Sequence, residues 1–104
     1  MIEVINKLES ELEIPFYYIS REEGQSPVVV YNYKKESNIS DMKKESSSYD
    51  FYFILIIDSN INKTVEKFEE ILINNLFRNV TVNQSATTKE GNIQISITGS
   101  KNIE

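Results

Sequence analysis

The chain of 104 residues contains no cysteine, no histidine and no tryptophan. Without cysteine it has neither a disulfide nor a thiolate that could act as a nucleophile or metal ligand. Without histidine, Ser-His pairs, Cys-His pairs and imidazole-bound metals are excluded as well. The three glycines are dispersed, so the sequence offers no glycine-rich phosphate loop. Only carboxylate chemistry is left for a catalytic site.

The carboxylates do not form a catalytic pattern. Three glutamates near residues 66–70 alternate with lysines, which is typical of a solvent-exposed helix. Asp50 and Asp58 share one predicted strand, but eight residues of strand span roughly 26 Å, too far for a shared metal or an acid/base pair. We therefore expect no catalytic residue, no metal and no cofactor, and we predict that the protein is not an enzyme.

The net charge is −5, and no basic patch dominates the sequence. Specific nucleic-acid binding is therefore not expected as the main activity. The strongest positive feature is a group of four lysines around one predicted loop: Lys34, Lys35, Lys43 and Lys44. A solvated loop is the plainest interpretation of these lysines. The first quarter of the chain is acidic and contains Glu9, Glu11, Glu13, Glu22 and Glu23.

The beginning of the chain is periodic and acidic, unlike a secretion signal with its basic start and apolar run. No stretch reaches the roughly 20 apolar residues that a membrane-spanning helix needs. We therefore expect synthesis in the cytoplasm and no contact with a membrane.

Two amphipathic helices are predicted. Residues 2–13 place apolar side chains at spacings of three and four, and Pro15 disfavours helical geometry at Ile14. Residues 63–77 have a similar apolar stripe that includes Phe68 and Leu72.

The remaining segments predict strands. Residues 16–20 and 28–34 are rich in aromatic and β-branched side chains. Residues 49–58 form the strongest strand and are apolar on both faces, which predicts a central strand covered on both sides. Helices should cover one face, and something else, such as a partner chain, should cover the other. Phe53 and Leu55 should be buried against the second helix. Residues 80–98 alternate around a turn and predict a hairpin.

Residues 35–48 are polar and contain Ile39 and Met42 as their apolar side chains, so we expect a flexible loop. Residues 99–104 are predicted to be a frayed tail. The expected fold is a single α+β domain over residues 1–98, in the order α-β-β-loop-β-α-β-β. Its sheet should be mostly antiparallel, with about five strands and two helices packed on one face.

The segment PVVVYNYKKESNISDMKKESSSYDFYFILIID, followed by TVEKFEEILINNL, resembles a known family. It is similar to the tail terminator, or tail-to-head joining, proteins of long-tailed phages and prophages. The resemblance lies in the order of elements: a Pro-led strand, a polar loop with Asn38 and Asp41, a strong strand, a turn with Asp58 and an amphipathic helix.

This resemblance implies a homo-oligomeric ring, as a hexamer, that caps a finished tail tube and joins it to the head connector or collar. DNA would pass through the ring, and the protein would be part of a virion or a tail-like particle. The candidate subunit interface joins the lysines named above, with Asn38 and Asp41, to the acidic first quarter of a neighbour. The alternative is a small acidic inhibitor or immunity-type protein that binds one basic partner.

Overall fold

The computed structural model describes residues 2–19, 26–40, 43–87 and 91–103. The elements follow in the order α1 (Ile2–Leu12), β1 (Phe16–Tyr18), β2 (Val28–Ser40), β3 (Lys43–Ile57), α2 (Ile61–Asn74), β4 (Arg78–Thr87) and β5 (Ile93–Ile103). The predicted α+β class, with a five-stranded, mostly antiparallel sheet and two helices, is confirmed.

The strands lie in the order β1-β2-β3-β5-β4, so β3 is the middle strand. β1 runs parallel to β2, whereas the pairs β2–β3, β3–β5 and β5–β4 are antiparallel. Tyr31 of β2, Phe53 of β3 and Ile97 of β5 are aligned across the sheet. Aligned residues point to the same face, so these three side chains mark one face of the sheet.

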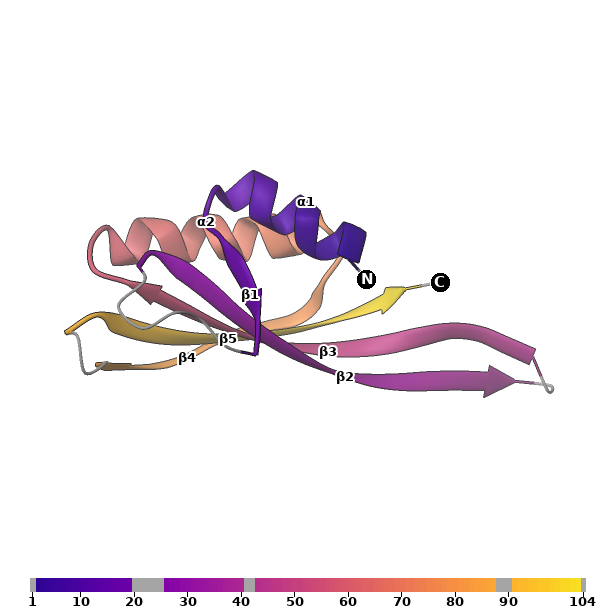
Figure 1. The fold of residues 1–104 in the computed structure, drawn as a ribbon. Helices are drawn as coiled ribbons and strands as arrows, with labels where there is room; N and C mark the ends of the chain where they lie inside the picture. The colour runs from indigo at the N-terminus through magenta and orange to yellow at the C-terminus, as the bar shows by residue number, and fades with distance from the viewer. Residues whose placement is uncertain (1, 20–25, 41–42, 88–90, 104) are drawn as a thin grey trace.

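Both helices cover that face of the sheet (Figure 1). Alternate side chains of β3 pack beneath them and are buried: Phe51, Phe53, Leu55 and Ile57. The helices contribute their apolar stripes: Ile5, Leu8, Leu12, Phe68, Ile71 and Leu72. The rings of Phe53 and Phe68 lie 5.3 Å apart between centroids. The predicted burial of Phe53 and Leu55 beside the second helix is therefore confirmed.

The predicted loop at 35–48 is wrong as secondary structure. β2 continues to Ser40 and β3 begins at Lys43, so both flanks of the expected loop are paired strands. Polar composition suggested a loop, but ladder hydrogen bonds join backbone groups and need no apolar side chains when the ribbon faces water. Residues 41–42 lie outside the described residues, and the predicted flexibility of the segment stays a prediction.

The predicted tail at 99–104 is also wrong over most of its length, because β5 extends to Ile103. The long β3 supplies its partner: Gly99 pairs with Phe51, and Ile103 pairs with Ser47. A Cβ atom at Gly99 would lie 3.3 Å from a ring carbon of Phe77. Glycine at this position thus lets the Phe77 ring approach the sheet, 5.2 Å from Phe51 between centroids.

The packing of β3 predicts a large difference between two adjacent aromatic residues. Phe53 is 1% exposed, whereas Tyr52 on the opposite face is 47% exposed. We expect Phe53→Ala to lower the free energy of unfolding by about 3–5 kcal/mol, because the lost ring leaves a cavity among four buried side chains. Tyr52→Ala is the matched control and should cost less than about 1 kcal/mol. Urea unfolding of both variants measures the difference, and equal losses would contradict the assigned faces.

Candidate assembly surfaces

The first candidate surface is the hairpin formed by β2 and β3. It continues beyond the helical layer as a two-stranded ribbon (Figure 1), and the molecule measures 51 × 24 × 24 Å. β5 ends opposite Ser47, and β1 pairs with β2 only at residues 29–31. Among the described residues, the outer part of the hairpin therefore has no strand neighbour beyond its own two strands.

The lysines predicted for the interface lie on this hairpin. Lys34 and Lys35 are both exposed, and they point to opposite faces of β2 as adjacent strand residues do. The ammonium of Lys34 lies 3.5 Å from the carboxylate of Glu36, and that of Lys35 lies 6.0 Å from the centre of the Tyr49 ring.

The backbone places three further predicted residues in the same ribbon. Asn38 pairs with Ser46, whereas Lys44 and Lys43 pair with Ile39 and Ser40. Hence the structure places the four lysines and Asn38 on one hairpin of paired strands, where the sequence predicted a loop. Asp41 lies outside the described residues.

The predicted acidic partner surface is less coherent. The Glu9 carboxylate accepts a hydrogen bond of 2.8 Å from the backbone N–H of Phe16, and the Glu11 carboxylate accepts one of 2.8 Å from the Asn75 amide. These two side chains therefore fasten the end of α1 to neighbouring segments. Glu13 is exposed just after α1 with a φ of 62°, and Glu22 and Glu23 lie outside the described residues.

The second candidate surface is the sheet face opposite the helices. Tyr52 and Ile54 of β3 are 47% and 37% exposed there. A shallow groove of about 260 Å³ runs beside them and is also lined by Ile19, Val30 and Asn32. Val28 and Ile56 on the same face are buried within the subunit, whereas Tyr52 and Ile54 keep exposed surface, so a partner chain over this part of β3 stays a prediction.

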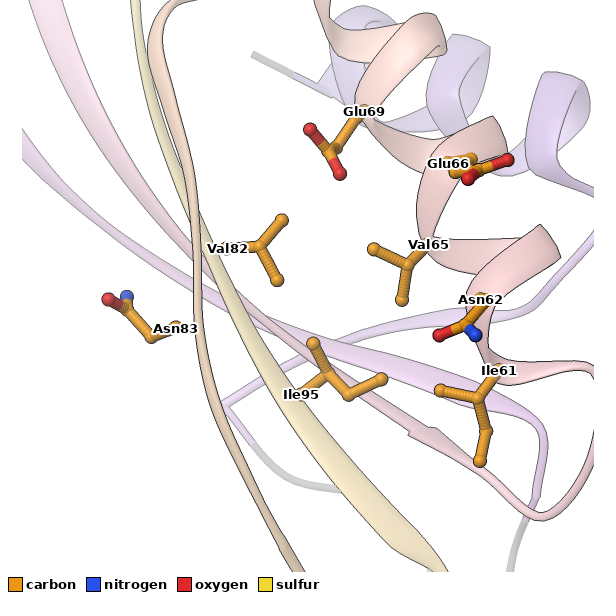
Figure 2. A pocket seen from close by; sticks show the side chains of 8 residues that line it. All are labelled: Ile61, Asn62, Val65, Glu66, Glu69, Val82, Asn83 and Ile95. Carbon is orange, nitrogen blue, oxygen red and sulfur yellow. The ribbon is translucent and has the colours of Figure 1, made fainter.

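The third candidate surface is a cleft of about 410 Å³ between α2 and the outer strands of the sheet (Figure 2). Val65 of α2 and Val82 of β4 face each other across it, and Ile95 of β5 lies at its floor. The cleft forms because α2 packs over the middle of the sheet and leaves Val82 37% exposed.

Carboxylates line the helical wall of this cleft. Glu66 and Glu69 project from α2 beside its opening (Figure 2). Glu70 lines an adjacent hollow together with them. Among the described residues, Lys34 and Glu36 form the one ion pair. No described cation therefore lies within 4 Å of the carboxylates of Glu66, Glu69 or Glu70. The sequence analysis missed this site, since periodicity identifies an exposed helix face but gives no information about which strand it overhangs.

A group of tyrosines extends from the core toward the hairpin. The Tyr18 ring contacts the rings of Tyr31 and Tyr33, with centroids 5.4 and 5.7 Å apart. Burial raises the pKa of the Tyr31 phenol above its ordinary value, and the phenols of Tyr33 and Tyr18 and the Glu9 carboxylate add to the effect. Burial also lowers the pKa of the Lys101 ammonium, with a further contribution from Lys7.

Among residues 2–19, 26–40, 43–87 and 91–103, no three acidic side chains come close enough to hold a metal ion. No helix in this part of the chain is long and apolar enough to span a membrane. The absence of a catalytic, metal or cofactor site, which the sequence leads us to expect, stays a prediction.

The chain matches no known protein family model, and no curated protein sequence matches it.

The hairpin's pairing pattern predicts unequal protection from hydrogen exchange. Amides at residues 50–57 belong to a strand paired on both sides, whereas those at 43–46 are paired with β2 alone. In the free subunit we expect residues 43–46 to exchange at least about 10-fold faster, because an isolated two-stranded ribbon is marginally stable. In an assembly in which the ribbon contacts a neighbour, residues 43–46 should become protected. Equal exchange in monomer and assembly would count against a role for the hairpin.

Proposed function

We propose that this protein is a structural subunit of a phage-type tail. It forms a ring that caps the end of the tail tube and mediates joining to the head connector or collar. The resemblance in the order of elements motivates the proposal. The single structural observation that supports it most is the charged hairpin that extends beyond the helical layer (Figure 1).

The length of this hairpin argues for a contact outside the subunit. β2 and β3 have 13 and 15 residues, whereas strands of globular domains usually have 3–10. A polar two-stranded ribbon buries little apolar surface and contributes little to the stability of its own subunit. A neighbour that pairs with the ribbon or packs on it would explain why these two strands are longer than usual.

The open sheet face provides a second surface of the kind that an assembly protein needs. Tyr17, Tyr52 and Ile54 are exposed together with Ile19 beside the groove on this face. Aromatic and aliphatic side chains of this kind are enriched at the centres of protein interfaces. A tail tube protein or connector that docks here would bury them.

The arrangement of charge favours self-assembly over the alternative of an acidic inhibitor. An inhibitor of one basic target would be expected to present a continuous acidic surface. Here Glu9 and Glu11 make hydrogen bonds within the subunit, and four lysines lie on the projecting hairpin. The hairpin carries charges of both signs, with Lys34 paired to Glu36, whereas the exposed face of α2 is rich in glutamate. Two such unlike patches suit contacts between identical copies.

Deletion of the gene from its phage or prophage tests the proposal. We expect tails of abnormal length, or complete tails that do not join heads, because the tube would lack its cap. Electron microscopy of induced lysates measures both defects, and supplying the gene in trans should restore normal particles. Tails of normal length attached to heads in the deletion strain would overturn the proposal.

A further inference from the structure

We propose that the cleft between α2 and β4 receives the outer edge of the β2–β3 hairpin from a second copy of this chain. The inference rests on the proposed function, because it identifies the subunit contact that a ring requires. It replaces the acidic first quarter of the chain with the acidic wall of α2 as the partner of the hairpin lysines.

The cleft has the composition of a protein-binding site. Its floor and sides are apolar and come from Ile61, Val65, Val82 and Ile95. Its rim is acidic, with Glu66 and Glu69 on the helical side (Figure 2). An apolar centre with a charged rim favours a partner that brings apolar side chains flanked by positive charge.

The hairpin of a second copy matches this requirement. Tyr33 and Lys35 lie on the face of β2 that the helices cover, the same face to which Val82 points on β4. If two sheets meet edge to edge with their helical layers on the same side, Lys35 approaches the α2 wall of the neighbour. The Lys35 ammonium is exposed, and Tyr33 is half-buried and so retains surface that a neighbour can cover.

The two strands concerned occupy opposite sides of the sheet. β4 is the last strand in the sheet order, and β2 has no described strand neighbour on its outer side beyond Tyr31. A contact between two different edges is heterologous, so repeating it generates a ring or a filament and not a closed dimer.

The strand directions make such a contact antiparallel. β5 is parallel to β2 because each is antiparallel to β3, and β4 is antiparallel to β5. Rotation about an axis to which the strands are tilted, as in a barrel, preserves the sense in which the strands run. The rotated copy would therefore place its β2 antiparallel to β4 of the first copy. Val82 is level with Tyr31, where β1 covers β2, so the neighbour must be shifted along the strands. Closed cylindrical sheets of tilted strands contain a stagger of this type.

The edge of β4 limits how much of the contact can be backbone pairing. Its register with β5 shifts between Arg78 and Thr81 and again between Val82 and Ser85. Irregularities of this kind discourage continuous strand addition. The side chains at the cleft must then provide most of the specificity, which makes the contact sensitive to the charges on its rim.

Charge reversal on either side tests this contact. The hairpin variant Lys35→Glu and the cleft variant Glu66→Lys/Glu69→Lys each place like charges against each other. We expect each to raise the Kd for self-association by about 10-fold or more, measured by analytical ultracentrifugation. Thermal unfolding should show that both variants remain folded, since the altered side chains are exposed or half-exposed.

Two controls are matched in charge. Lys63→Glu alters an exposed residue elsewhere on α2 by the same amount as the hairpin variant. Glu3→Lys/Glu13→Lys does the same for the cleft variant and alters exposed residues of the acidic first quarter. Both controls should associate as the unmodified protein does.

Mixing the two reversal variants gives the decisive measurement. Each fails to associate with itself, but the reversed hairpin of one complements the reversed cleft of the other. We expect a 1:1 mixture to restore assemblies that contain equal numbers of the two chains. Because Lys and Glu have almost equal masses, one variant is labelled with ¹⁵N so that native mass spectrometry can identify the mixed assemblies.

Three outcomes would overturn the inference: unmodified protein that stays monomeric at about 1 mM, reversal variants that still associate, or a mixture that does not. If one of these outcomes is found and the gene deletion still gives abnormal tails, the contact is wrong but the proposed tail function is supported. If the deletion gives normal tails and the mixture still assembles, the tail function is wrong but the subunit contact is supported.

Discussion

The structure depends on the burial of one face of β3. Phe51, Phe53 and Leu55 lie on this face and are each 1% exposed or less. Because β3 is the middle strand, both helices and the neighbouring strands must pack around these side chains. At roughly 25 cal/mol per Å² of apolar area removed from water, this layer provides most of the free energy that orders the chain. The positions of α1, α2 and Phe77 follow from it.

A one-sided core has consequences for the other surfaces. Two helices are enough to cover the middle of a five-stranded sheet, but not its outer strand β4 or the far half of the hairpin. The cleft beside Val82 and the exposed tyrosines of the open face both arise from this incomplete cover. The surfaces available to partners are therefore determined by where the helices end.

Most of the fold could be predicted from local patterns in the sequence. The apolar stripe with Phe68 and Leu72 identified a helix, and the alternation around Phe53 identified the central strand and its buried face. These predictions succeeded because burial imposes the periodicity of the element on the sequence. Residues 35–48 and 99–103 are mostly polar and contain no such periodicity, so the sequence does not indicate the strands there.

The candidate surfaces were less predictable, since they depend on contacts between distant segments. The grouping of Lys34, Lys35, Lys43 and Lys44 was visible because they lie close together along the chain. Glu66 and Val82 are sixteen positions apart and meet only through the packing of α2 beside β4. Likewise, Glu11 looked free in the sequence but accepts a hydrogen bond from Asn75.

The distribution of charge between rigid and projecting parts constrains how this chain can associate. The α2 carboxylates lie on a helix fixed by Phe68 and Leu72 in the core, so they form a preorganised wall. Among the described residues, Lys43 and Lys44 lie where β2 and β3 pair only with each other, whereas Lys34 and Lys35 lie level with the end of β5. When a ribbon of this kind meets a fixed acidic wall, the cost of ordering falls on the ribbon alone. Association between copies then depends on the charge and shape of the wall, and the core need not change.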